Sequence, residues 1–192
     1  MKLGPLIIVS GPSGSGKSTL IKLAMSTFES RLRHSVSATT RPPRPGERDG
    51  SDYHFWSRER FEAAIGAGEL LEYAIVHGQH YYGTPRSEVE PYRECGIGVI
   101  LDIDVQGAGQ IRKSCPDAFT IFLNTPAGTY EERLRDRKTE SEEQIQSRLQ
   151  TARDELARVS EFDVQLLNDS MDRAAAELIG LIGRRFDPHQ GR

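Results

Sequence analysis

The fold of this chain is decided by the stretch Gly11-Pro12-Ser13-Gly14-Ser15-Gly16-Lys17-Ser18, which Thr19 follows. It comes after an apolar run at 6–9 and before a segment, 20–25, that suits a helix. A glycine loop of spacing G-x-x-x-x-G-K-S between a strand and a helix is a P-loop, whose backbone N–H groups bind phosphate. Lys17 would reach the outer phosphates, and the Ser18 hydroxyl would bind Mg²⁺. The stretch therefore predicts a site for a nucleoside triphosphate.

Length and composition indicate one globular domain. The 192 residues are 36% hydrophobic and 28% charged, with a formal net charge of −3. This charge argues against a general nucleic-acid binder, and no apolar stretch is long enough for a membrane span. Cys95 and Cys115 lack a C-x-x-C spacing, which favours free thiols in a reducing cytoplasm. We expect a cytoplasmic monomer or small homo-oligomer whose partners are small molecules.

Short apolar segments that alternate with helical patterns predict an α/β fold, a parallel sheet of the P-loop type flanked by helices. The last helix is expected at 172–185. The expected strands are Leu6–Ser10, 34–38, Gly98–Asp102, 119–123 and Val164–Leu167.

The segment between residues 38 and 98 is too long for one crossover and predicts an inserted α+β subdomain over about 35–95. Residues 53–56 and 70–74 are typical of short strands. Ser57 is placed as the N-cap of a helix over 58–67.

A charge-dense region predicts a helical lid over about 126–159, which leaves 1–34, 96–125 and 160–192 as the core of a single domain. Ser141 and Gln144 have the spacing of a capping box. The helix that they open has an apolar face at three- and four-residue steps. That face consists of Ile145, Leu149, Ala152, Leu156 and Val159.

Carboxylates follow the strand Gly98–Asp102, as in a Walker B strand. Asp102 could hold Mg²⁺ through water, and Asp104 could accept a hydrogen bond from a substrate. Farther back, Arg41 and Arg44 stand among three prolines, which stiffen the backbone at low entropic cost. Guanidinium groups suit bidentate phosphate recognition, so a second phosphate site is expected here.

Together these motifs resemble the guanylate kinase family, whose members phosphorylate GMP with ATP. The matching segments are 11–19, 35–46, 52–55, 71–74, 81–84, 101–107, 133–148 and 168–169. The resemblance implies a transferase of purine nucleotide metabolism with ATP and GMP, or also dGMP, as substrates and Mg²⁺ as cofactor.

The resemblance also assigns the acceptor side residue by residue. The clamp on the GMP phosphate would be Arg41, Arg44, Tyr53 and Tyr82. The guanine readers would be Ser37, Glu72 and Thr84, with Asp104 as a further ligand. A carboxylate such as Glu72 suits the N1–H and N2 donors of guanine, whereas adenine would leave it unpaired, a mismatch that can reject a base by about 10⁴-fold.

On the donor side, the resemblance places Asn168 and Asp169 beside adenine. The lid arginines Arg133, Arg137 and Arg148 would join Lys17 and Arg44 in neutralising charge on the transferring phosphoryl group. The P-loop residues, Gly11 to Thr19, would hold the ATP phosphates.

The sequence departs from the family at four places. Thr84 stands where serine is common, and the segment between Glu72 and Tyr82 is one residue longer. Lys138 replaces a glycine, and Pro91 falls early in a helix expected after Ser87. Two alternatives remain: a kinase of the same fold that acts on a ribose phosphate, and a non-catalytic module that binds phosphopeptides.

Overall fold

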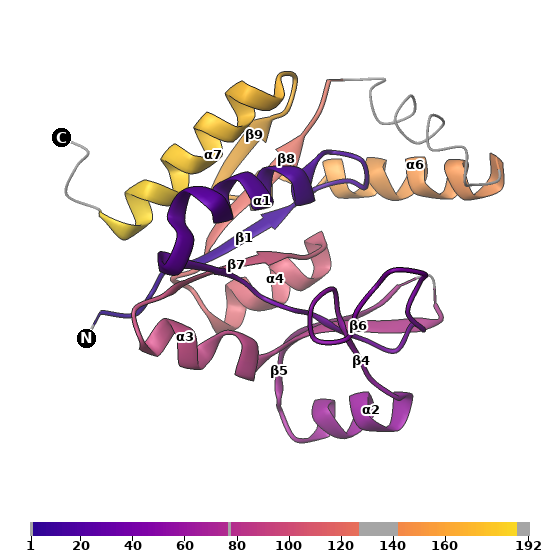
Figure 1. Ribbon diagram of the computed structural model, residues 1–192. Helices are drawn as coiled ribbons and strands as arrows, with labels where there is room; N and C mark the ends of the chain where they lie inside the picture. The colour runs from indigo at the N-terminus through magenta and orange to yellow at the C-terminus, as the bar shows by residue number, and fades with distance from the viewer. Residues whose placement is uncertain (1, 77, 127–141, 188–192) are drawn as a thin grey trace.

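The computed structural model describes residues 2–76, 78–126 and 142–187, in which the chain forms two sheets (Figure 1). The larger sheet has five parallel strands in the order β2-β7-β1-β8-β9. Their bounds are β1 Leu6–Ser10, β2 Leu32–His34, β7 Gly98–Asp102, β8 Phe119–Asn124 and β9 Val164–Leu167. The predicted α/β class is confirmed.

Helices cover both faces of the larger sheet, so its central strand is buried on two sides. Ile7 and Val9 belong to the core shared with α1 (Lys17–Phe28) and α7 (Met171–Phe186). Leu6 and Ile8 enter the opposite core with α3 (Glu90–Glu94) and α4 (Val105–Ser114). Because both faces are buried, β1 is a continuous apolar run rather than an alternating one.

The smaller sheet has the order β4-β3-β6-β5 and is covered on one face by α2 (Arg58–Gly66). Its strands are β3 Ala38–Thr39, β4 His54–Phe55, β5 Leu70–Val76 and β6 His80–Pro85. Phe61 of α2 stacks on Tyr81 with ring centroids 5.0 Å apart. The predicted N-cap is confirmed, since the Ser57 hydroxyl accepts a hydrogen bond from the Arg60 N–H at 3.2 Å.

The expectation of one strand over 34–38 is wrong. The chain leaves the larger sheet after His34, with a last hydrogen bond from Ser35 N–H to Ile100 O at 3.0 Å, and enters the smaller sheet at Ala38. The strand expected at 53–56 is reduced to the two residues of β4. Sequence reasoning did not predict β6 as a strand, because His80–Pro85 lacks an apolar run.

The Glu88 carboxylate contacts the segment that leaves the larger sheet and lies in the segment that returns to it. Glu88, in the short turn η2 (Arg86–Glu88), accepts from the Val36 N–H at 3.4 Å and lies 3.0 Å from His54 Nε2. It also forms an ion pair with Arg33 of β2. Burial alone would raise the pKa of Glu88, but the hydrogen bonds from Arg33 and His54 hold it below its usual value. The outgoing chain, the returning chain and the smaller sheet therefore meet at one group.

The remaining elements are η1 (Glu29–Arg31), α6 (Glu142–Leu156) and η3 (Val159–Glu161). The helix expected to include Val159 ends at Leu156, and Val159 opens η3 instead. The Ser141–Gln144 capping box and Lys138 lie outside what the structure describes. Pro91 is in the first turn of α3, where its missing N–H is tolerated.

No helix among the described residues is both long and apolar enough to cross a bilayer.

Candidate active site

The P-loop leaves β1 and enters α1 through three glycines with positive φ. Gly11, at φ 138°, passes so close to β8 that an added Cβ would lie 2.2 Å from Leu123 O. Gly16 is left-handed and precedes α1, whose first turn has no acidic residue. The loop therefore offers backbone N–H groups and a helix N-terminus to an anion, as the sequence predicts.

Lys17 bends back across the loop. Its Nζ donates to Gly11 O at 2.6 Å and to Pro12 O at 3.3 Å, and it lies 4.0 Å from the Asp102 carboxylate. The ammonium group is thus held over the loop's own backbone, where it can neutralise the charge of a phosphate.

Ser18 and Asp102 meet at the end of β7, as a Mg²⁺ site requires. The Ser18 hydroxyl donates to Asp102 Oδ2 at 3.5 Å. No cluster of three His, Cys, Asp or Glu side chains that could hold a metal occurs among the described residues. Such a pair of oxygen ligands fits Mg²⁺, which keeps several waters and binds through one or two protein groups plus substrate phosphates.

Asn168 supports the P-loop from behind. Its Nδ2 donates to Ser15 O at 2.7 Å, and the side chain is buried. Asp169 forms an ion pair with Arg173 of α7. The structure thus gives Asn168 a bracing contact, and a place for both residues beside adenine stays a prediction.

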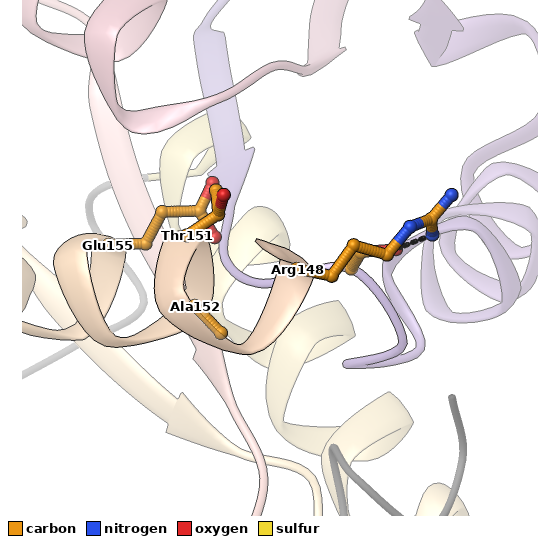
Figure 2. A pocket seen from close by; sticks show the side chains of 5 residues that line it. Arg148, Thr151, Ala152 and Glu155 are labelled. Atoms are coloured by element: carbon orange, nitrogen blue, oxygen red, sulfur yellow. Dashed lines mark hydrogen bonds between the residues drawn. The ribbon is translucent and has the colours of Figure 1, made fainter. Parts of the chain in front are cut away.

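Arg148 connects α6 to the P-loop. Its Nη1 donates to Ser13 Oγ at 3.1 Å across a cavity of about 210 Å³ (Figure 2). Arg133 and Arg137, the other expected lid arginines, lie outside the described residues. The cavity is lined by Ser13, Arg148, Thr151, Ala152 and Glu155.

Glu155 is a group that sequence reasoning missed. It stands two turns of α6 after Arg148, hence on the same side of the helix, and burial raises its pKa to about 7. The charge of nearby Lys17 lowers this pKa and that of Asp104 raises it. The signal available in the sequence was this seven-residue spacing from Arg148.

Five of the predicted acceptor residues share one face of the smaller sheet. Glu72 of β5 pairs with Thr84 of β6, and Tyr82 stands two residues earlier on β6. Thr39 of β3 pairs with both Tyr82 and Phe55. Because side chains alternate along a strand, the residues two positions before Thr39 and Phe55 fall on this same face. The residues thus brought together are Ser37, Tyr53, Glu72, Tyr82 and Thr84.

Glu72 is a buried carboxylate with a fixed partner. It is 5% exposed, and its Oε1 accepts from the Thr84 hydroxyl at 2.6 Å. Burial raises its pKa to about 7, with a further contribution from the charge of Asp104. Asp104 itself caps α4, since its Oδ1 accepts from the Gly107 N–H at 2.8 Å. Asp104 therefore lies near both carboxyl groups whose pKa is raised, those of Glu72 and Glu155.

Arg41 lies at the edge of this face. Its Nε donates to the Tyr82 hydroxyl at 3.1 Å, and its guanidinium carbon is 5.5 Å from the Tyr53 ring centroid. Glu47, which no sequence motif indicated as a site residue, accepts from Arg41 Nη2 at 2.8 Å and from the Arg44 N–H at 2.7 Å. Arg44 is exposed. One carboxylate thus orders the loop that carries both arginines.

A P-loop on one sheet and a basic, carboxylate-bearing face on a second sheet define the class as a P-loop phosphotransferase with two substrate sites. Comparison with known proteins identifies the family within this class. The family model described as guanylate kinase matches residues 4–184.

Guanylate kinases from two bacteria are similar over nearly the whole chain. The protein from Rubrobacter xylanophilus is 50% identical over 185 residues, which cover 96% of each chain. That from Parasynechococcus marenigrum is 47% identical over 182 residues, which cover 94% of this chain and 99% of its own. The crystal structure of guanylate kinase from Anaplasma phagocytophilum superposes with a TM-score of 0.76 at 28% identity, covering 97% of this chain and 88% of that one.

The chain belongs to the guanylate kinase family and is thus a nucleoside monophosphate kinase. The family indicated by the sequence motifs is confirmed.

Proposed function

We propose that the protein transfers the γ-phosphoryl group of Mg·ATP to the 5′-phosphate of GMP, and also of dGMP, giving ADP and GDP. The observation that carries this proposal is the buried Glu72 carboxylate, held by Thr84 on the face that also bears Tyr82. A carboxylate in this setting is suited to a base that presents two adjacent donors.

Guanine supplies those donors. Its N1–H and N2 amine would both donate to Glu72, while the Ser37 and Thr84 hydroxyls would serve as the other guanine readers. Adenine presents an acceptor at N1 and would leave the buried carboxylate unpaired, which is costly away from water.

The acceptor phosphate would be held by Arg41, Arg44, Tyr53 and Tyr82. Arg41 already has its guanidinium ordered by Tyr82 and Glu47, which supports a preorganised clamp. Preorganisation reduces the entropy lost when a ligand binds. Asp104, fixed as the cap of α4, would be a further ligand on this side.

The ATP phosphates would lie in the P-loop, with Lys17 over the outer ones and the adenine beside Asn168 and Asp169. Ser18, together with Asp102 through water, would hold Mg²⁺, which neutralises charge between the outer phosphates when bound. The short separation of Lys17, Ser18 and Asp102 supports this assignment.

Catalysis would consist of positioning and charge neutralisation. The acceptor oxygen belongs to an ionised phosphate, so no strong base is required, and the transfer is in line. Lys17, Arg44 and Arg148, with Arg133 and Arg137, would neutralise the charge of the moving phosphoryl group. Closure of a lid over about 126–159 on a GMP-binding subdomain over about 35–95 would exclude water that otherwise accepts the group.

Two other functions are less well supported. A ribose-phosphate kinase has no base to read and no use for the buried Glu72–Thr84 pair. A phosphopeptide-binding module has no need of Lys17 or of Arg148, whose guanidinium reaches the P-loop. Cys95 and Cys115 are free cysteines, which supports the proposal that the enzyme acts in a reducing cytoplasm.

An ADP-release assay with GMP, dGMP, AMP, UMP and ribose bisphosphate in parallel tests the proposal. GMP and dGMP should be used and the other acceptors rejected. Glu72→Gln should lose GMP use selectively, because one of the two acceptor oxygens becomes an NH2 group, which donates and cannot accept from guanine. A parent protein that uses AMP as readily as GMP would refute a guanine pocket. Turnover of ribose bisphosphate without turnover of GMP would also refute it.

A further inference from the structure

Two residues of α4, one helical turn apart, contact the strand that carries Glu72. They are Gly107 and Gln110, and Figure 1 shows α4 on the side of β5 opposite to α2. Because α4 begins just after the Asp102 carboxylate of the larger sheet, these contacts join the two substrate sites.

Gly107 is in direct contact with the Glu72 carboxylate. A Cβ added at Gly107 would lie 2.5 Å from Glu72 Oε2 and 3.0 Å from its Cδ, closer than van der Waals contact allows. Both residues are buried, so the carboxylate has little room to move aside. The backbone of α4 therefore limits where the second carboxylate oxygen can lie.

Gln110 holds the backbone of the next residue, Tyr73. Its Oε1 accepts from Tyr73 N–H at 3.2 Å, and its Nε2 donates to Tyr73 O at 2.7 Å. β5 is at the edge of the smaller sheet, so the primary amide takes the place that a neighbouring strand would have. Glu72 is thus fixed on one side by Thr84 and on the other by a bidentate bond to the adjacent peptide.

We propose, on the basis of the function proposed above, that Gly107 and Gln110 are positioning residues that set the specificity for guanine. Gln110 fixes the position of the β5 backbone relative to α4, and the Gly107 backbone packs against the Glu72 carboxylate. Together they aim both carboxylate oxygens at the N1–H and N2 donors of the base, although neither residue contacts the nucleotide itself.

A structural role alone does not account for Gln110. The Gln110 side chain is half-exposed, and Tyr73, whose backbone it bonds, is 38% exposed, so little apolar area depends on the contact. Loss of these two bonds should therefore change substrate recognition more than stability.

Gln110→Ala and the matched control Gln106→Ala test the assignment. Gln106 is an exposed glutamine on the same helix. With two hydrogen bonds lost, Gln110→Ala should raise KM for GMP about tenfold and leave KM for ATP within about twofold. Gln106→Ala should match the parent in both.

Gly107→Ala supplies a second readout, the preference for GMP over IMP, which lacks the N2 amine. An added methyl group should displace the carboxylate and reduce that preference about tenfold. Thermal unfolding of this variant shows whether it folds, and Gln110→Ala tests the assignment in either case.

Equal rises in KM for GMP and ATP, or a Gln110→Ala variant that matches Gln106→Ala, would overturn the assignment while the parent still prefers GMP over AMP. A parent without that preference would refute the proposed function and this assignment together.

Discussion

The two regions that we propose bind the substrate phosphates are built in different ways. The P-loop is one short segment whose backbone turns at Gly11 and Gly16 and whose lysine bonds its own carbonyls. The acceptor face instead gathers side chains from separate strands of a second sheet, with Glu72 and Thr84 as its buried centre. A backbone site can recognise phosphate in any nucleotide, whereas a side-chain site can distinguish one base from another.

The largest expected effect is on the backbone-built region. Lys17→Ala should leave the fold intact, because among the described residues its side chain bonds to its own loop and to Asp102, and should lower kcat by about 10³-fold. The control is Lys22→Ala, an exposed lysine of α1. The ADP-release rate, with circular dichroism to check folding, measures both. Activity within a few-fold of the parent would contradict the role of Lys17.

The pH dependence of GMP binding tests the side-chain region. With a pKa of about 7 in the free protein, Glu72 is protonated at lower pH and must lose that proton to accept from guanine. The affinity for GMP should therefore fall by up to about tenfold for each pH unit below 7.

Calorimetry at several pH values measures this slope, and the variants isolate its cause. Since the phosphate of GMP also titrates near pH 6, the relevant quantity is the difference between the parent and Glu72→Gln. Glu155→Gln is the matched control, because that carboxyl has the same raised pKa but lies on α6. A slope that persists unchanged in Glu72→Gln would rule out Glu72 as its source.

The smallest effect concerns the connection between the two regions. Glu88→Ala removes the partner shared by Arg33 and His54 and should lower the free energy of unfolding by about 1–3 kcal/mol. Glu90→Ala, which breaks an exposed pair with Arg86, should change it by less than about 1 kcal/mol. Urea denaturation compares the two. Equal losses would mean that Glu88 is an ordinary surface group.

The larger sheet was predicted well because burial on both faces leaves apolar runs that a sequence shows directly. Leu6–Ser10, Gly98–Asp102 and Val164–Leu167 have the predicted bounds. The smaller sheet was predicted less well: β3 and β4 have two residues each, and β6 is rich in polar and aromatic residues. Such strands are defined by their partners rather than by their own composition.

The candidate site shows the same division. The P-loop is contiguous, so its spacing alone was enough to select Lys17 and Ser18 as candidate site residues. The acceptor residues were assigned through family resemblance, and the structure places five of them on one face. Glu155 and Gly107 were missed because the groups that they lie near are far away in the sequence: the charges of Lys17 and Asp104 for Glu155, and the Glu72 carboxylate for Gly107.

The most direct test of this division is to measure ATP and GMP affinities by calorimetry for Lys17→Ala and Glu72→Gln side by side. We expect Lys17→Ala to weaken ATP binding and to leave the GMP affinity within about twofold of the parent. Glu72→Gln should weaken GMP binding by about tenfold or more and leave the ATP affinity unchanged. Equal weakening of ATP and GMP binding by Glu72→Gln would contradict the claim that Glu72 of the smaller sheet reads the base.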